Sequence, residues 1–445
     1  MADNSQENAK FSGWTVTAAA FIIVVCHMMI RGSFATLIQG MVASTGWSTG
    51  VVSVGTSLFM VMYGLFAFFV GTYINKLGCR VTYTLHGIIM AVGLFLCSYA
   101  QEPWQYWVSY GIIAGIGSGA FWAPVTSMVR QWFIDKLGLA MGLTTAAAGV
   151  AMCLGPIVSM NLIAGFSWQF MMRVFAIILA VGIGVGAQFT IMKPEDAGQK
   201  PLGFDAFMAK QAAASTDAKP KSEYWVPFKW FVKTKYFWIL AGLWFFSNFA
   251  EFIVFSHAVN YTTMDLGYDK RTATYIYCLI GLVFIFSAVG IGGFVDKLTA
   301  KIGDPMVARK RVLTVSYIGC AAMAAWLNYG VRITAGDGTV VWAFVIYALL
   351  FGFFYGMYIP SVAGLVGLVP GRKEMPPAWG LISLIGMAGG AGLGPYIAGA
   401  LRDATGSYFV AIWLSTIFYL VACLLTNMAK RPTAEETAEA QASVK

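Results

Sequence analysis

The segment that decides the fold is Gly71–Arg80, which reads GTYINKLGCR and separates two apolar stretches. Each of these stretches has roughly 20 residues, enough to cross a bilayer as a helix. A shorter version of the segment, GFVDK at Gly293–Lys297, follows another apolar stretch in the second half of the chain. Counted from Gly292, it has the pattern Gly-x-x-x-Asp-Lys. Two halves that share one loop pattern predict an internal repeat of membrane-spanning units.

Apolar stretches recur along all 445 residues, of which 58% are hydrophobic and 11% are charged. A mean hydropathy of +0.70 excludes an ordinary soluble domain. We expect an all-α membrane protein with twelve transmembrane helices in two six-helix repeats. The first stretch is too long for the core of a signal peptide, so we expect it to be retained. The predicted spans are 14–38, 49–72, 81–100, 105–128, 139–164, 171–192, 236–260, 273–295, 312–329, 339–366, 377–400 and 408–428.

The net charge of +9 follows the pattern of membrane topology. With the N-terminus in the cytoplasm, the outer loops hold only Lys270, Arg271, Arg332 and Arg402, and most other Lys and Arg fall on the cytoplasmic side. This asymmetry predicts a multi-pass protein of the cell inner membrane with both termini cytoplasmic. Anionic membrane lipid accounts for the basic residues, so we expect no nucleic-acid partner.

A polar segment from Lys193 to Lys235 divides the twelve stretches into six and six. Its low-complexity composition is typical of a linker. We therefore predict an N-terminal six-helix bundle at 1–192, a cytoplasmic linker at 193–235, a C-terminal six-helix bundle at 236–430 and a cytoplasmic tail at 431–445. Phe228, Trp230 and Phe231 suggest a short interfacial helix at the end of the linker, because aromatic residues anchor at headgroup level.

Two segments resemble signatures of the major facilitator transporters. The loop Gly71–Arg80 resembles that family's Gly-x-x-x-Asp-(Arg/Lys)-x-Gly-Arg motif, although Asn75 stands where an Asp is usual. The run from Arg130 to Gly142, RQWFIDKLGLAMG, is similar to the monocarboxylate and oxalate:formate branch. The resemblance implies a twelve-helix transporter that works by alternating access. The residues for which it implies gating or structural roles are Gly71, Lys76, Gly78, Arg80, Arg130 and Asp296.

Arg31 and Glu251 are charges placed deep inside predicted spans, and Glu251 is the only acidic residue within any of them. A charge near a bilayer centre costs about 2.5–3.5 kcal/mol on insertion scales, which favours a functional reading. In the resembled monocarboxylate carriers, a span 1 lysine close to the position of Arg31 meets the substrate carboxylate. Two other interpretations stay open: Arg31 snorkels to an interface, or it forms a static ion pair with Glu251.

Further candidates for a substrate site surround these two charges. His27 shares a helix face with Arg31, and Asn248 shares one with Glu251. By resemblance, Ser383 and Ala288 stand near positions where the oxalate carrier has basic residues, which implies a monoanionic substrate. Aromatic candidates are Trp122, Tyr355 and Tyr358. The last two belong to a stripe with Tyr347 and Phe351 at helical spacing, for which simple packing stays open.

Four predicted spans contain a proline: Pro124, Pro156, Pro360 and Pro395. Proline lacks a backbone donor and clashes with the preceding turn, so we expect a helix break at each. Such breaks would allow the helices to bend when they rock. For the glycine-rich stretch 386–394, close packing without a hinge stays open.

The sequence predicts a secondary active transporter of a small organic monocarboxylate, by proton-coupled symport. Arg31 would contact the anion and Glu251 would carry the proton. The alternatives are an organic anion exchanger and a proton-driven exporter. The sequence has no P-loop or dinucleotide-binding glycine motif, and its three histidines are scattered. We therefore expect no enzyme activity, no cofactor, no metal and a monomeric protein.

Overall fold

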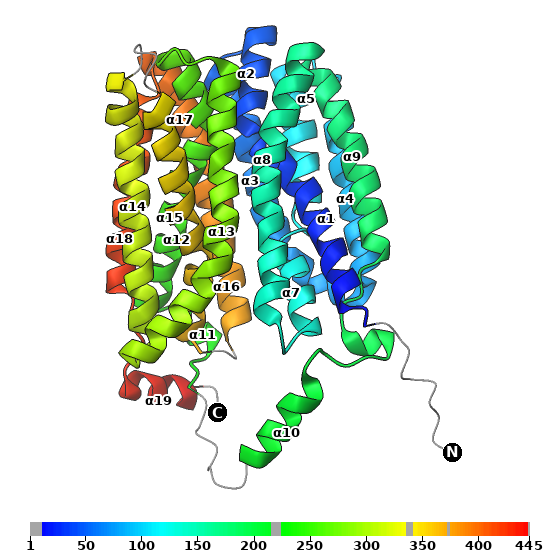
Figure 1. Cartoon of the computed structure of the whole chain (residues 1–445), viewed down its shortest axis with the longest axis vertical. Helices are drawn as coiled ribbons and strands as arrows, with labels where there is room; N and C mark the ends of the chain where they lie inside the picture. The colour runs from blue at the N-terminus through cyan, green and yellow to red at the C-terminus, as the bar shows by residue number, and fades with distance from the viewer. Residues whose placement is uncertain (1–10, 215–223, 335–340, 372–373, 444–445) are drawn as a thin grey trace.

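The computed structural model describes residues 11–214, 224–334, 341–371 and 374–443. Within these ranges the chain is helical, apart from an isolated β-bridge between Phe133 and Leu202. Twelve helices in the described residues are long and apolar enough to cross a membrane, which confirms the predicted number of spans (Figure 1). The side at which α1 begins and α18 ends is called the near side below, and the opposite side is called the far side.

The helices of the first half and of the linker follow the predicted order. The first half contains α1 (Gly13–Gly32), α2 (Phe34–Thr45), α3 (Thr49–Leu77), α4 (Cys79–Cys97), a fourth span made of α5 (Pro103–Tyr106), η2 (Trp107–Ala114), α6 (Gly115–Ser118) and α7 (Ala123–Trp132), then α8 (Leu137–Gly165) and α9 (Trp168–Gln188). The linker contains η3 (Pro194–Ala197), α10 (Phe204–Ala214) and α11 (Phe228–Phe231).

The second half repeats this succession of spans. It contains α12 (Lys235–Asn260) continued by η4 (Tyr261–Asp265), then α13 (Lys270–Ile302), α14 (Pro305–Thr334), α15 (Val341–Leu368), a composite span of α16 (Met375–Leu384), η5 (Ile385–Ala391) and α17 (Gly392–Thr405), and α18 (Phe409–Met428). A final helix, α19 (Ala434–Ala442), lies on the near side (Figure 1).

The first predicted span is not one continuous helix. It breaks at Ser33, where α1 ends and α2 begins. The Ser33 hydroxyl donates to the carbonyl of Met29 at 2.7 Å, and such side-chain bonds compete with the regular backbone ladder. The helix face that carries Arg31 therefore does not continue regularly into Phe34 and Ala35.

The proline expectation is wrong at three of four positions. Pro156, Pro360 and Pro395 lie inside the uninterrupted helices α8, α15 and α17. Membrane helices tolerate proline in this way because neighbouring groups satisfy the freed backbone carbonyls. The fourth span does break before Pro124, which occupies the first turn of α7.

The most extensive packing between the described parts of the two halves is that of α8 along α13 and of α3 along α17, and α2 also packs against α12. Glycines permit the close approach. A Cβ atom added to Gly149 on α8 would lie 2.7 Å from the carbonyl oxygen of Gly281 on α13. A Cβ added to Gly64 on α3 would lie 2.6 Å from the backbone nitrogen of Ala388. Small residues therefore set the spacing between the halves, as is common in membrane helix packing.

Each described end of the linker is bonded to a different half. The backbone N–H of Ile134 donates to the carbonyl of Leu202 at 2.9 Å, on the first half. The backbone N–H of Val226 donates to the carbonyl of Pro370, also at 2.9 Å, on the second half. The short helix expected at the end of the linker is present as α11. The predicted domain bounds themselves remain a prediction.

Candidate functional site

Arg31 lies in the last turn of α1, with its guanidinium against two aromatic rings. The Cζ atom is 5.0 Å from the ring centre of Tyr63 on α3 and 5.1 Å from that of Phe252 on α12. Cation–π contacts of this kind stabilise a guanidinium that is withdrawn from water. Because α3 belongs to the first half and α12 to the second, Arg31 lies where the two halves meet.

The guanidinium of Arg31 has no strong hydrogen-bond acceptor among the described residues. Its Nη1 donates to the thioether sulfur of Met28 at 3.4 Å, and a thioether is a weak acceptor. Its Nε is buried and has no acceptor within the described part of the chain. An arginine edge in this state can donate two parallel hydrogen bonds to a carboxylate.

Glu251 is buried on α12, with only 4% of its surface exposed. The hydroxyl of Tyr355 donates to its Oε1 at 2.9 Å, and the hydroxyl of Tyr358 donates to its Oε2. Both tyrosines lie on α15. Because a tyrosine hydroxyl can donate or accept, this pair can satisfy the carboxyl group in its ionised form and in its protonated form.

Arg31 and Glu251 are neighbours without being an ion pair. In the described ranges, ion pairs form between Lys200 and Asp205 and between Arg402 and Asp265. The guanidinium of Arg31 nonetheless contacts the ring of Phe252, the residue that follows Glu251 on α12. The static ion pair considered from the sequence is therefore absent from this conformation.

His27 and Asn248 are both completely buried. The Nε2 atom of His27 is hydrogen-bonded to the Ser118 hydroxyl at 2.7 Å, and its ring lies 5.9 Å from that of Tyr63. His27 thus contacts the same tyrosine as Arg31 does. Asn248 donates from Nδ2 to the carbonyl of Trp244 at 2.7 Å, while its Oδ1 is buried with no donor among the described residues.

Trp122 and Ser383 are half-buried, at irregular points of their spans. Trp122 lies in the break between α6 and α7, and Ser383 lies near the end of α16. In the described structure, neither is joined to Arg31 or Glu251 by a hydrogen bond or a ring contact. The structure thus brings Tyr355 and Tyr358 to Glu251 and leaves these two candidates further out.

Sequence reasoning missed Tyr63 and Phe252, the two rings at Arg31. Phe252 directly follows Glu251 in the chain, and this adjacency is the signal that could have found it. Tyr63 carries no comparable signal, because it is one of 20 tyrosines in an aromatic-rich chain. Helical spacing indicates which residues share a face, but it does not indicate which other span that face meets.

The loop residues implied by resemblance lie on the near side. Gly78 ends α3 with a φ of +80°, a conformation that favours glycine. Arg80 donates from Nε to the carbonyl of Thr190 at 3.1 Å, beyond α9 of the same half. Asp296 is exposed on α13 of the second half. Gly71, Lys76 and Arg130 are exposed.

The far side carries polar contacts between the halves. The carboxylate of Asp403, on α17, accepts the backbone N–H of Thr49 at 3.1 Å and that of Gly50 at 2.7 Å. These are the first amides of α3, so the carboxylate caps the positive end of that helix. The Gln39 side-chain amide also donates to the Thr263 hydroxyl at 2.8 Å. Hydrogen bonds therefore connect the two halves on the far side.

Comparisons with known proteins agree with this architecture. Residues 20–327 match the model of the Major Facilitator Superfamily. The chain is 23% identical over 433 residues to monocarboxylate transporter 12-B of Danio rerio, covering 93% of this chain and 86% of that protein. It is 24% identical over 435 residues to monocarboxylate transporter 12 of Xenopus laevis, covering 94% and 88%.

A solved structure has the same fold with little sequence identity. It is a bacterial homolog of the human lysosomal transporter Spinster, in an inward-facing and unoccupied conformation. The TM-score is 0.67 at 15% identity, and the match covers 97% of this chain and 99% of that one. With twelve spans in two halves and a family match over most of its length, the chain belongs to the Major Facilitator Superfamily and is a membrane transporter of that type.

Proposed function

We propose that this transporter moves a small organic monocarboxylate together with a proton. The observation that carries the proposal is the central pair of unjoined charges: Arg31, with a buried Nε that lacks an acceptor, and Glu251, held between two tyrosine hydroxyls. One cation for the anion and one protonatable acid are the parts that electroneutral symport needs. The relatives named monocarboxylate transporters support the class of substrate.

The orientation follows from the charge pattern. The near side would face the cytoplasm of the cell inner membrane, because most Lys and Arg of the loops lie on that side. The bundles at 1–192 and 236–430 would rock as a monomer about the pairs α3–α17 and α8–α13. Far-side contacts through Asp403 would stabilise the inward-facing form. The outward-facing form would instead be stabilised on the near side by the loop residues Gly71, Lys76, Gly78, Arg80, Arg130 and Asp296.

The anion would bind at the edge of the Arg31 guanidinium, where donors lack good acceptors. Tyr63 and Phe252 would hold the guanidinium in place, and His27 would act through its contact with Tyr63. We place the remaining candidates, Asn248, Trp122 and Ser383, around the non-ionic part of the substrate. Because Phe252 and Glu251 are consecutive on α12, an anion bound to Arg31 would lie next to the helix that carries the acid.

The proton would bind to Glu251. When the carboxyl group is ionised, Tyr355 and Tyr358 both donate to it. When it is protonated, one tyrosine hydroxyl turns to accept its O–H, so the site stays satisfied. Protonation would remove the negative charge near Arg31 and thereby strengthen binding of the substrate anion, which couples the two ligands.

The Asp403 contact gives a conformational prediction. Asp403→Ala removes a charged cap from α3, an interaction worth about 1–2 kcal/mol. The ratio of far-side-open to far-side-closed molecules should therefore rise about 5- to 30-fold. Distances between spin labels at Ala43 and Ala404, on opposite halves of the far side, measure this ratio. Asp269→Ala is the matched control, because Asp269 caps α13 through the Thr272 amide at 2.9 Å within one half. Equal distance distributions for both variants would contradict the proposed function of Asp403 in closing the far side.

The substrate should be a monoanion. By resemblance, Ala288 and Ser383 stand near positions where the oxalate carrier has basic residues, which would leave Arg31 as the cation that meets the substrate. A second carboxylate would be desolvated without a partner, at several kcal/mol of effective penalty. Lactate-like, short aliphatic or small aromatic monocarboxylates should therefore compete for uptake at least about tenfold better than oxalate or succinate. Competition at a pH where all these acids are ionised measures it, and a dicarboxylate that outcompetes every monocarboxylate would refute it.

A further inference from the structure

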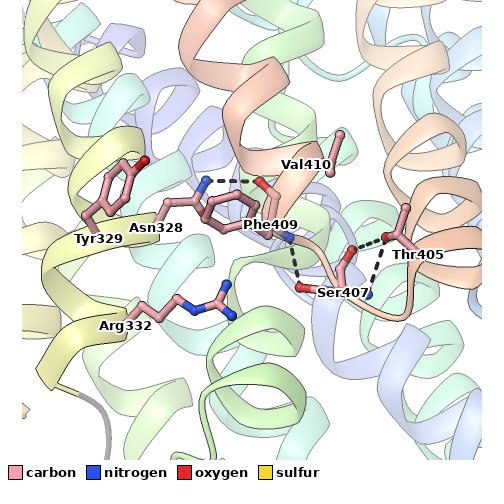
Figure 2. A pocket seen from close by; sticks show the side chains of 7 residues that line it. All are labelled: Asn328, Tyr329, Arg332, Thr405, Ser407, Phe409 and Val410. Carbon is pink, nitrogen blue, oxygen red and sulfur yellow. Dashed lines mark hydrogen bonds between the residues drawn. The ribbon is translucent and has the colours of Figure 1, made fainter.

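A hollow opens on the far side of the second half, between the end of α14 and the start of α18 (Figure 2). Its volume is about 800 Å³. Arg332 reaches into it with its guanidinium carbon 5.1 Å from the ring centre of Phe409, and the turn at Ser407 forms the opposite wall. None of the described residues that line this α14–α18 hollow is acidic. The Ser407 hydroxyl in its wall donates at 2.7 Å to Asp265, a carboxylate that lies 3.4 Å from the Nε atom of Arg402.

A second hollow of about 730 Å³ opens on the far side of the first half, between the end of α4 and the start of α9. Arg173 lines it, with its guanidinium carbon 4.9 Å from the ring centre of Tyr99. The Nε atom of Arg173 donates to the Ser98 hydroxyl at 3.1 Å, and the Ser167 hydroxyl lies on the same wall. Again, none of the lining residues is acidic.

The two hollows occupy equivalent places in the repeat. Helices α4 and α14 form the third spans of their halves, and α9 and α18 form the sixth. The arginine comes from the sixth span in the first half and from the third span in the second half. Both hollows therefore contain a guanidinium, an aromatic ring and at least one serine hydroxyl. The arginine, however, comes from a different position of the repeated unit in each half.

Both hollows continue into surfaces that lipid would cover. The exposed apolar side chains along the four helices are Val92, Phe95 and Leu96 on α4, Ile177, Val181 and Val185 on α9, Val315, Ile318 and Trp326 on α14, and Ile417, Leu420 and Leu424 on α18. At the hollows themselves, Tyr99 is 59% and Tyr329 is 51% exposed. Tyrosine and arginine at the ends of spans are typical of the headgroup level of a bilayer.

We propose that each hollow binds one anionic phospholipid of the far leaflet. The headgroup phosphate would accept hydrogen bonds from Arg332 in the α14–α18 hollow and from Arg173 in the α4–α9 hollow. The acyl chains would lie along the exposed apolar side chains of the paired helices. An arginine at the head of an apolar groove, with no acidic residue among the described lining residues, matches an amphipathic anion better than it matches a small soluble one.

The test is to count lipids bound to the full chain by native mass spectrometry. Delipidated protein is titrated with phosphatidylglycerol, phosphatidylcholine or inorganic phosphate. Wild type should retain two phosphatidylglycerol molecules, Arg173→Gln and Arg332→Gln one each, and the double variant none. Arg271→Gln should retain two, since Arg271 is an exposed arginine outside both hollows. Arg→Lys at either position should restore partial retention, which separates loss of the cation from misfolding.

Three results would overturn the proposal. The double variant could retain as much phosphatidylglycerol as wild type, phosphatidylcholine could bind as well as phosphatidylglycerol, or inorganic phosphate could displace the lipid. The first would leave the arginines without a role in lipid binding. The second would remove the preference for a net anionic headgroup, and the third would indicate a site for small anions.

Discussion

Arg31→Ala should greatly reduce monocarboxylate uptake at concentrations near the wild-type KM. The substitution removes charge-assisted hydrogen bonds, each worth about 1.5–3 kcal/mol, which corresponds to at least a 10- to 100-fold weaker affinity. Arg31→Lys keeps the charge but loses the planar pair of donors, so it should bind with intermediate affinity. Equilibrium binding of a monocarboxylate to purified protein measures the effect.

The control for this prediction is Arg271→Ala, which removes an exposed arginine away from the central site. Its affinity should equal that of wild type. The melting temperature of each variant should be measured alongside, because Arg31 also contacts Tyr63 and Phe252. A folded Arg31→Ala protein with normal affinity would remove Arg31 from the binding site.

Glu251→Gln should uncouple transport from the proton gradient while preserving exchange of substrate across the membrane. Glutamine mimics the protonated carboxyl group and can still hydrogen-bond with Tyr355 and Tyr358. In a one-to-one symporter, each unit of pH difference supports about a tenfold accumulation of substrate. The wild type should approach this ratio, and Glu251→Gln should equilibrate substrate without accumulating it.

A matched substitution tests whether the loss of proton coupling is specific to Glu251 or follows from the removal of any carboxylate. Glu102 is an exposed acid on the far side, and Glu102→Gln should accumulate substrate as the wild type does. Counterflow of labelled substrate into preloaded vesicles checks that Glu251→Gln still binds and translocates. Accumulation by Glu251→Gln that rises with the pH difference as in the wild type would assign the proton to another group.

Composition and spacing predicted the fold because long apolar stretches have few alternatives in a bilayer. The number and order of the twelve spans could therefore be inferred from their positions along the chain. The break at Ser33 could not be inferred in this way, because the hydropathy of the sequence continues across it.

The sequence identified the charged residues of the candidate site, but it did not identify the side chains that contact them. Helical periodicity placed Tyr347, Phe351, Tyr355 and Tyr358 on one face of α15 without indicating which of them meet Glu251. In the structure, Tyr355 and Tyr358 bond to the carboxylate, whereas Tyr347 and Phe351 stack at 5.4 Å as packing. The rotation of one helix against another decides such contacts, and a single sequence contains little information on it.

The Asp403 contact illustrates the same limit. The sequence places this acid after a glycine-rich span, which is compatible with an ordinary surface residue. Its function as a cap appears only when α17 is packed along α3, since the amides of Thr49 and Gly50 are more than 350 positions away. A Cβ atom at Gly50 would lie 2.7 Å from the carboxylate oxygen, so a larger residue there would displace the Asp403 side chain from these amides.

The central claim is that monocarboxylate and proton cross the membrane together through Arg31 and Glu251. Proteoliposomes loaded with a pH-sensitive dye test it directly, when an inward gradient of monocarboxylate is imposed without any internal anion to exchange. We predict internal acidification that tracks uptake of the labelled acid one for one, and that vanishes in Arg31→Ala vesicles, which report passive leak. Uptake without acidification, or uptake that requires an internal organic anion, would contradict symport and indicate an exchanger.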